Sequence, residues 1–439
     1  MMAQNLDDMP VTPFLRKVIA FSSGGPFLEG YVLSIVSVAF LQMQPELNID
    51  NHWSGLIGVA ALVGLTFGAL IGGWVTDQLG RKKMFIIDLA VIIILSLLFF
   101  GATSALHVAI LRFLIGVAIG ADYPIATAII AEFAPRKYRA VCLGIIAAVW
   151  YLGANVAWIV GYALADVTGS WRWMLASSVI PCLIILVGRW SIPESPRWLY
   201  AQGRTEEAHK IVESIYGCRL VIEEEVTPTS TYRSLLQGTY MRRVLFVSTI
   251  WLCQVIPMFG IYTYGPQLMQ EMGLGDGSSA LIGEVIIGTL FMLGTIPAMI
   301  LSEKWGRRPL IIWSFLGMTV STAALGIIPN TSALMVVMCF GFYALCSGGP
   351  GNLQWLYPNE LFPTDVRASA MGLATALSRI GTVVSIYILP AALDSYGQGP
   401  IMLGAAVISL IGLAVSIAWA PETRGLPLSV TSSKNFTGR

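Results

Sequence analysis

The sequence predicts an all-α membrane protein with about twelve transmembrane helices in two six-helix pseudo-repeats. Three observations lead to this fold class. Of the 439 residues, 56% are hydrophobic and only 12% are charged, whereas a soluble domain is about one quarter charged. Apolar stretches of roughly 18 to 25 residues recur along the chain, and this is the length that a helix needs to cross a bilayer. Short motifs also recur at a nearly constant spacing, which indicates a duplicated chain.

The predicted elements follow the chain as two groups of six apolar stretches. Residues 1–193 form the N-terminal half, residues 194–240 a charged cytoplasmic linker with short surface helices, and residues 241–439 the C-terminal half with a short tail. Each predicted helix is an apolar run bounded by polar, glycine-rich or basic residues. The expected spans are 16–44, 53–78, 83–103, 105–134, 137–166, 172–193, 241–272, 278–303, 308–327, 332–362, 366–394 and 398–421.

Lysine and arginine gather in the loops on one side of the predicted membrane. These loops are 80–83, 135–139, 303–308, the central linker and the tail, while the opposite loops carry only Arg172. By the positive-inside rule, both termini are cytoplasmic, and we expect a multi-pass protein of the bacterial cytoplasmic (inner) membrane. The N-terminus shows no cleavable signal pattern, so the first helix is expected to remain.

Three motifs of the N-terminal half have echoes in the C-terminal half. "DQLGRKK" at 77 corresponds to "EKWGRRP" at 303, "EFAPRKYR" at 132 to "ELFPTDVR" at 360, and "PESPRW" at 193 to "PETRG" at 421. The echoes keep their order and nearly the same offset. Such a duplication is typical of transporters whose halves rock around a site at the membrane midplane.

These motifs resemble the major facilitator superfamily over essentially the whole chain. Segments 193–198, 254–267 and 421–425 are similar to its sugar-porter branch. Other segments resemble other branches: "GADYPIA" (120–126) phosphate symporters, "FLEGYVL" (27–33) aromatic-acid symporters and "ALSRIG" (376–381) organic-ion transporters; 347–370 resembles an enterobacterial inner-membrane metabolite transporter. The resemblance implies the major facilitator fold and alternating access, and it leaves the cargo open.

Charged residues at the repeated motifs are candidate gates. Glycine-rich helix ends permit close helix approach, and carboxylate and arginine side chains seven residues apart can bridge neighbouring helices. The alternative is that these are interfacial charges that only fix the topology. The predicted gating residues are Asp77, Gly80, Arg81, Glu132, Arg139, Glu303, Arg307, Glu360 and Arg367.

Glu29 and Arg112 lie within predicted spans, where ionisable residues are expected to be paired and functional. A first-helix carboxylate opposite a fourth-helix arginine resembles the proton-coupling pair of sugar/proton symporters. We therefore predict that Glu29 carries the proton and that Arg112 modulates it. The alternative is a static structural pair.

Asp122 and Arg379 are the second intramembrane pair. Asp122 precedes Pro124, which disturbs the helix where the acid lies. The resemblance of this segment to phosphate symporters implies that Asp122 takes part in proton coupling and substrate binding. We predict that an anionic substrate breaks a bridge from Asp122 to Arg379. A permanent bridge between the halves is the alternative. Asp88 and Glu284 are predicted to be structural.

Polar and aromatic residues of the seventh and tenth helices are candidate substrate contacts. An amide both donates and accepts hydrogen bonds, and an aromatic ring can stack on a sugar face. The alternative is that they form interhelical hydrogen bonds and ordinary packing contacts. With Asp122 and Arg379, the predicted substrate-binding residues are Gln254, Tyr262, Tyr264, Asn352, Gln354 and Trp355.

Together these features predict a proton-coupled symporter that imports a small polar metabolite, with a sugar acid or related hydroxylated carboxylate as the first choice. A neutral sugar or polyol is the second choice, and export of a drug or metabolite the third. A nutrient sensor built on a transporter scaffold is the competing class. An enzyme is not expected, because the three histidines are scattered and the six cysteines lack metal spacing. The expected partners are a small molecule, protons and the lipid bilayer, with no cofactor, no metal, no nucleic acid and a monomeric state.

Overall fold

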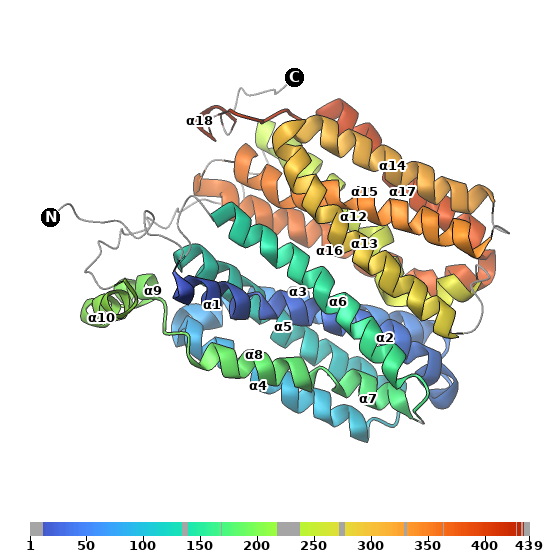
Figure 1. Cartoon of the computed structure of the whole chain (residues 1–439), viewed down its shortest axis with the longest axis horizontal. Coiled ribbons are helices and arrows are strands. Elements are labelled where there is room, and N and C mark those ends of the chain that lie inside the picture. The colour runs from blue at the N-terminus through green and yellow to red at the C-terminus, as the bar shows by residue number, and fades with distance from the viewer. Residues whose placement is uncertain are drawn as a thin grey trace. The chain divides into compact units, whose positions relative to one another are not determined.

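The computed structural model describes the chain as helices joined by short connections (Figure 1). The described residues are 12–133, 139–167, 169–216, 238–271, 277–328, 332–362, 364–426, 428–431 and 433. Within these ranges the structure contains no strand. Eleven described segments are long and apolar enough to cross a membrane, and a further apolar segment, Ala148–Leu164, is shorter. The predicted all-α membrane fold is thus confirmed.

The chain divides into two compact units. The N-terminal unit comprises Met1–Leu47 and Val59–Val226, and the C-terminal unit comprises Asn48–Gly58 and Thr227–Arg439. Helix α3 (Asn51–Leu79) therefore begins in the second unit and continues in the first. The described residues 194–216 of the predicted linker belong to the N-terminal unit.

In the N-terminal unit, α2 packs against α6, and α4 packs against α5 and α8. Short α9 and α10 follow the last membrane segment, and their contact buries Leu199, Ala208 and Val212. The helices of this unit besides α3 are α1 (Pro13–Ser22), α2 (Gly24–Leu47), α4 (Arg81–Leu97), the 3-10 turn η2 (Leu98–Gly101), α5 (Ala105–Phe133), α6 (Arg139–Leu164), α7 (Ser170–Ala176), α8 (Val179–Trp190), α9 (Pro196–Ala201) and α10 (Thr205–Tyr216).

In the C-terminal unit, α14 packs against α15 and α17, α13 against α15, and α12 against α16. The start of α3 belongs to this unit and is held by hydrogen bonds, including one from the Asn51 amide to Asp394 (2.7 Å) and one between His52 and the Tyr387 hydroxyl (2.7 Å). The other helices are α12 (Gly238–Glu271), α13 (Gly277–Lys304), α14 (Arg307–Ile327), α15 (Ala333–Leu361), α16 (Thr364–Tyr396), α17 (Gln398–Trp419) and α18 (Leu428–Thr431).

Two predicted spans are interrupted in the structure. The span predicted at 16–44 consists of α1 and α2, separated at Ser23, where Gly24, Gly25 and Pro26 follow. The span predicted at 172–193 consists of α7 and α8, separated at Ser177 and Ser178. The Ser177 and Ser178 hydroxyls donate to carbonyls three residues earlier, and such local bonds compete with regular helix bonding.

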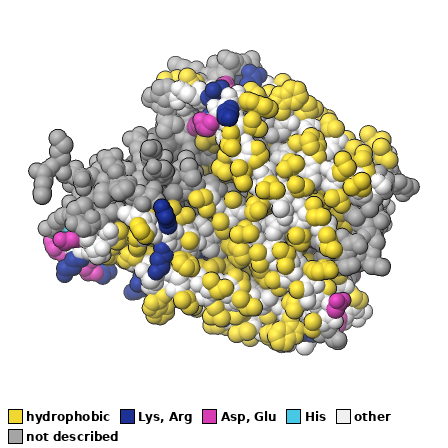
Figure 2. Space-filling model, in the orientation of Figure 1, with side chains coloured by type: hydrophobic (Ala, Val, Ile, Leu, Met, Phe, Trp, Pro, Cys, Tyr) yellow, Lys and Arg dark blue, Asp and Glu magenta, His cyan; other side chains and the backbone are white. Residues whose placement is uncertain are grey.

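Apolar side chains cover the sides of the helices (Figure 2). Many are large and strongly exposed, including Val187 at 75% and Leu334 at 70%. Basic and acidic side chains gather toward the helix ends and on α10 in the same view. Because water would penalise such an apolar surface, its natural surrounding is the hydrocarbon of a bilayer.

Candidate functional site

Glu29 and Arg112 are buried near one another in the N-terminal unit. Glu29 of α2 is 3% exposed, and Arg112 of α5 is 1% exposed. The Arg112 guanidinium donates to the carbonyl of Val32 at 3.3 Å. Val32 lies one helical turn beyond Glu29, so the arginine reaches the part of α2 that carries the carboxylate. Their proton-coupling role stays a prediction.

Asp122 has a different partner from the one that the sequence suggested. Its two carboxylate oxygens accept hydrogen bonds from the two terminal nitrogens of Arg189 in α8, at 2.7 and 2.9 Å. All these groups lie in the N-terminal unit, whereas Arg379 belongs to the C-terminal unit. Asp122 is thus paired with Arg189 inside its own unit, and the bridge from Asp122 to Arg379 stays a prediction. A substrate role for Asp122 requires the bond to Arg189 to open.

Arg189 is the functional candidate that the sequence analysis missed. It stands next to Trp190 at the end of α8, where an arginine ordinarily reaches the membrane interface. In the structure it is 1% exposed and lies over the ring of Phe85 at 3.6 Å. Two buried aspartates, Asp88 and Asp122, were the signal that a buried cation had to exist among these helices.

Arg379 lies within the C-terminal unit on α16. Its guanidinium is 5.2 Å from the ring centroid of Phe259 on α12, a distance at which a cation interacts with an aromatic face. Phe259 itself is 2% exposed. The half-buried Arg379 therefore places a positive charge beside the Phe259 ring of α12.

Gln254 on the same helix is buried, with 1% exposure. Its amide nitrogen donates to the Ser347 hydroxyl of α15 at 3.0 Å, while its buried Oε1 accepts no hydrogen bond from a described residue. The buried Oε1 of Gln354 on α15 likewise accepts no hydrogen bond from a described residue. Asn352 instead donates to the Thr295 carbonyl at 2.9 Å, which ties α15 to α13.

The predicted aromatic contacts lie on α12 and α15 as well. Trp355 packs edge-on against Trp251, with ring centroids 5.1 Å apart, and Tyr262 lies 5.4 Å from Phe291. The Tyr264 hydroxyl donates to the Ser54 carbonyl at 2.9 Å, and its backbone leaves the helical conformation at φ −131° and ψ 20°. Pro257 and Pro266 interrupt the backbone bonding of α12 on either side.

The repeated motifs form the same junction in both units. At Gly80 (φ 98°) the Glu194 carboxylate accepts hydrogen bonds from the backbone N–H groups of Arg81 (2.9 Å) and Lys82 (3.2 Å). This carboxylate caps the start of α4, where unpaired N–H groups favour a negative charge.

In the C-terminal unit, Glu422 accepts from the backbone of Arg307 (3.0 Å) and Arg308 (3.1 Å), beside Gly306 with φ 105°. Glu194 and Glu422 belong to the "PES" and "PET" motifs, so their repetition in the sequence was the signal for these caps.

Arg307 also holds the ion pairs of the predicted C-terminal gate. Its guanidinium contacts Glu303 at 2.9 Å and Glu360 at 3.0 Å, and Thr423 donates to the same Glu360 carboxylate. The expected link from Glu360 to the Arg307 motif is therefore present, while gating itself stays a prediction. Four predicted gate side chains lie outside the described part of the structure: Asp77, Glu132, Arg139 and Arg367.

Among the described residues, no group of three or more histidine, cysteine, aspartate or glutamate side chains has the arrangement of a metal site.

Comparisons with known proteins agree with this architecture. The family model described as "Sugar (and other) transporter" matches residues 17–433. The chain is 49% identical to YaaU of Escherichia coli (strain K12) over 437 residues, covering 100% of this chain and 99% of that protein. It is 36% identical to the "Inner membrane metabolite transport protein YgcS" of the same strain, covering 96% and 95%.

The fold is similar to that of a solved transporter. The "partially occluded inward open conformation of the xylose transporter XylE from E. coli" matches with a TM-score of 0.80 and 21% identity, covering 95% of this chain and 100% of that one. The relatives are transporters and not enzymes. The chain therefore belongs to the sugar transporter family of the major facilitator superfamily and is a multi-pass membrane transporter.

Proposed function

We propose that this transporter imports a small hydroxylated acid, such as a sugar acid, together with protons. It works as a monomer in the bacterial inner membrane, with both termini in the cytoplasm. The observation that carries the substrate class is that one unit holds both the cationic Arg379 and a buried Gln254 amide oxygen that accepts no hydrogen bond from a described residue.

Gln254 suits the hydroxyl groups of such a molecule, and Arg379 suits its carboxylate. A buried amide oxygen that accepts no hydrogen bond favours a hydroxyl donor, because an unmet buried acceptor costs free energy. Gln254 and Gln354 each supply one such oxygen. A guanidinium offers a planar fork that fits a carboxylate. Arg379 therefore supplies the charge that a neutral sugar would not use.

Proton coupling is assigned to Glu29 with Arg112. Both are buried, and Arg112 bonds the backbone one turn from the carboxylate. Burial favours the protonated acid and a nearby arginine favours the carboxylate, so a motion that changes their separation takes up or releases a proton. XylE, which has the same fold, is described as a "proton:xylose symporter".

The capped junctions serve as gates in this scheme. Glu194 and Glu422 each bind the first N–H groups of a helix, and Arg307 joins Glu360. These contacts lie within single units, so we assign them the role of holding the helix ends in place while the units change their arrangement. Substitution of these residues is expected to alter the transport rate more than substrate affinity.

A neutral sugar is the second candidate. XylE is named for xylose transport, and the amide oxygens of Gln254 and Gln354 suit any polyol. In that case Arg379 has a structural role on the Phe259 ring.

Thermal unfolding of the detergent-purified protein distinguishes the two substrates. Sugar acids, neutral sugars, polyols and phosphate are each added to the wild type and to Arg379→Gln. A ligand at 100 times its dissociation constant stabilises the folded state by about 2.7 kcal/mol. Our proposal predicts stabilisation by sugar acids in the wild type and its loss in Arg379→Gln.

Arg424→Gln is the matched control, because Arg424 is an exposed arginine of the same unit. It should respond like the wild type. Equal stabilisation of the wild type and Arg379→Gln by neutral sugars would instead establish the second candidate.

A further inference from the structure

Asp88, Asp122 and Arg189 form a charge cluster inside the N-terminal unit. Arg189 binds both oxygens of Asp122, with Nη1 to Oδ1 at 2.7 Å and Nη2 to Oδ2 at 2.9 Å. The same Nη1 lies 3.7 Å from Oδ2 of Asp88. The two carboxyl groups also interact electrostatically with each other. One guanidinium of α8 therefore faces one carboxyl group from α4 and one from α5.

The cluster is closed to solvent. Asp88 is 3% exposed, and Asp122 and Arg189 are each 1% exposed. The remaining donors of Arg189 reach backbone carbonyls, Nε that of Phe21 at 3.0 Å and Nη1 that of Phe85 at 3.4 Å. Because a guanidinium stays charged, two ionised aspartates would leave one buried negative charge without a counter-ion.

The described neighbours do not supply the missing positive charge. The titratable or charged groups that interact with Asp88 are Asp122, Arg189 and the Cys182 thiol of α8. From the first-helix side, the cluster meets the Phe21 carbonyl and the backbone of Gly25. Asp88 Oδ1 accepts from the Leu89 N–H at 2.7 Å, and its buried Oδ2 takes part in no hydrogen bond with a described group. A proton on this pair balances the charge.

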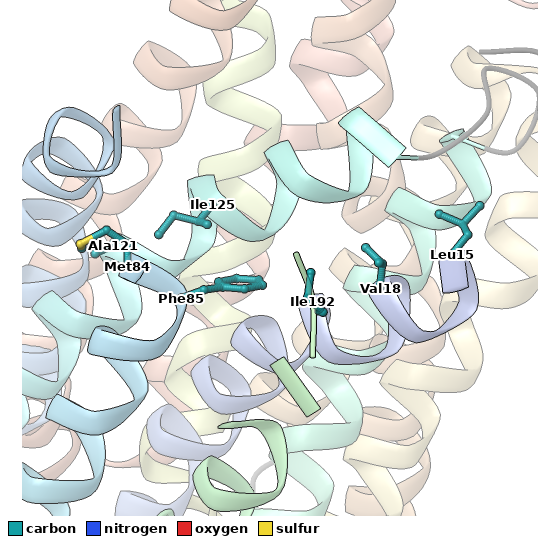
Figure 3. Packing of buried hydrophobic residues seen from close by; sticks show 7 residues of the cluster. All are labelled: Leu15, Val18, Met84, Phe85, Ala121, Ile125 and Ile192. Carbon is teal, nitrogen blue, oxygen red and sulfur yellow. The ribbon is translucent and has the colours of Figure 1, made fainter. Parts of the chain in front are cut away.

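An apolar cluster lies beside these charges toward the arginine-rich ends of the helices. Figure 3 shows the ring of Phe85 near Ile125 and Ile192. Phe85 lies three positions before Asp88, Ile125 three positions after Asp122, and Ile192 three positions after Arg189. In each case the apolar residue is nearer than the charged residue to a loop that carries lysine and arginine. The members are Leu15, Val18, Met84, Phe85, Ala121, Ile125 and Ile192. In our proposal this apolar cluster hinders the direct passage of protons from that end.

The other approach passes the interruption of the first membrane helix. A side chain at Gly25 would overlap the Asp122 carboxylate, so this carboxylate lies directly against the start of α2. The Phe21 carbonyl, which Arg189 binds, belongs to α1. A movement of α1 against α2 would change the environment of Asp122 and Arg189 together.

We propose that Asp88 and Asp122 share one proton beside Arg189 and that this carboxyl pair is a second protonation site of the transport cycle. The Arg189 guanidinium positions the ionised partner, and the proton neutralises the other one. Motion at the α1–α2 interruption opens the site to proton exchange. The role of this carboxyl pair in coupling rests on the proposed proton symport, whereas the presence of the shared proton does not depend on it.

Infrared spectroscopy of the purified protein tests the shared proton directly. The probe is the proton itself, exchanged for deuterium, which shifts the carbonyl stretch of a protonated carboxylic acid. At neutral pH we expect the wild-type spectrum to contain, besides any band of the buried Glu284, a band that is absent from both Asp88→Asn and Asp122→Asn. Asp394→Asn is the control, because this carboxyl group is exposed and hydrogen-bonded to Asn51. Full band intensity in both single variants would overturn the proposal.

A thermal unfolding cycle provides a second readout if one variant folds poorly. Asp88→Asn and Asp122→Asn each leave one carboxylate for Arg189, so both should unfold near the wild-type temperature at neutral pH. The double variant leaves the guanidinium without a counter-ion, so its loss should far exceed the sum of the single effects. Additive effects would contradict the shared proton.

The outcome separates this site from the proposed function. If Glu29→Gln still accumulates cargo while the Asp88–Asp122 band remains, the assignment of Glu29 fails and the second site stands. If the band is missing from the wild type, the second site fails and Glu29 remains the proton carrier.

Discussion

In each unit, a buried carboxyl group lies against a glycine that precedes a proline. In the N-terminal unit, Asp122 lies against Gly25, next to Pro26; in the C-terminal unit, Glu284 lies against Gly265, next to Pro266. The surroundings of the two carboxyl groups differ. Asp122 is bound by Arg189, whereas neither oxygen of the fully buried Glu284 has a hydrogen-bond partner among the described residues.

The repeated junctions, in contrast, are alike in the two units. Glu194 and Glu422 cap α4 and α14 with the same geometry, beside glycines with φ of 98° and 105°. The duplicated parts are thus those that hold the helix ends together, and the buried charges are the parts that have diverged. We infer that the common scaffold supports the rocking motion and that the N-terminal unit carries most of the proton chemistry.

The largest effect is expected for Arg189→Met. It leaves Asp122 and Asp88 buried without a cation, and breaking a buried ion pair costs about 3–5 kcal/mol. Chemical unfolding in detergent measures the loss. Arg172→Met is the control, because Arg172 pairs with the half-exposed Glu46 and should lose no more than about 1 kcal/mol. Equal losses would show that burial does not distinguish the two pairs.

The next effect concerns the two glycines. In Gly25→Ala and Gly265→Ala, the added methyl group overlaps Asp122 and Glu284, respectively, and overpacking typically costs about 1–3 kcal/mol. We expect the greater loss for Gly25→Ala, because Asp122 cannot move without stretching its bonds to Arg189. Unfolding temperatures of the two variants provide the comparison, with Gly404→Ala as the control in open space. A greater loss for Gly265→Ala would contradict this ranking.

The helix caps should respond alike in the two units. Glu194→Gln and Glu422→Gln each remove a negative charge from a helix start, and a cap contributes about 0.5–2 kcal/mol. Thermal unfolding should show similar losses for both variants, because both carboxylates accept from two successive N–H groups. A loss confined to one variant would mean that the junctions are not equivalent.

The smallest effect is expected for Arg204→Ala on the surface. Arg204 donates hydrogen bonds to Glu207 and lowers the pKa of that carboxyl group. A lowered folded-state pKa stabilises the protein above the unfolded-state pKa, and this stabilisation is lost as the pH falls through the folded-state value. Because both side chains are exposed, water screens the pair. Unfolding temperatures at neutral and acid pH should match the wild type, and a clear change at neutral pH would show that α10 matters more than its exposure suggests.

The sequence was sufficient for the membrane fold and the repeated junctions. Span length and hydropathy follow from the local chain, and the "GRKK" and "GRRP" echoes mark the same helix start twice. The interruption at Ser177 and Ser178 was not predicted, because two serines in an apolar stretch are compatible with an unbroken helix.

The charge partners could not be predicted in the same way. Asp88, Asp122 and Arg189 come from three helices that are far apart along the chain, so their meeting depends on helix packing and rotation. Asp122 was recognised as a buried acid by its position alone. Arg189 was overlooked because an arginine beside a tryptophan at the end of a span is also typical of a membrane interface.

Uptake into liposomes under an imposed proton gradient tests proton coupling most directly. The cargo is the sugar acid that stabilises the purified protein most strongly, and the wild type is compared with Glu29→Gln. Our account predicts that the wild type accumulates the acid above its external concentration and that Glu29→Gln only equilibrates it. Accumulation by Glu29→Gln, or none by the wild type, would contradict the assignment of proton coupling to Glu29.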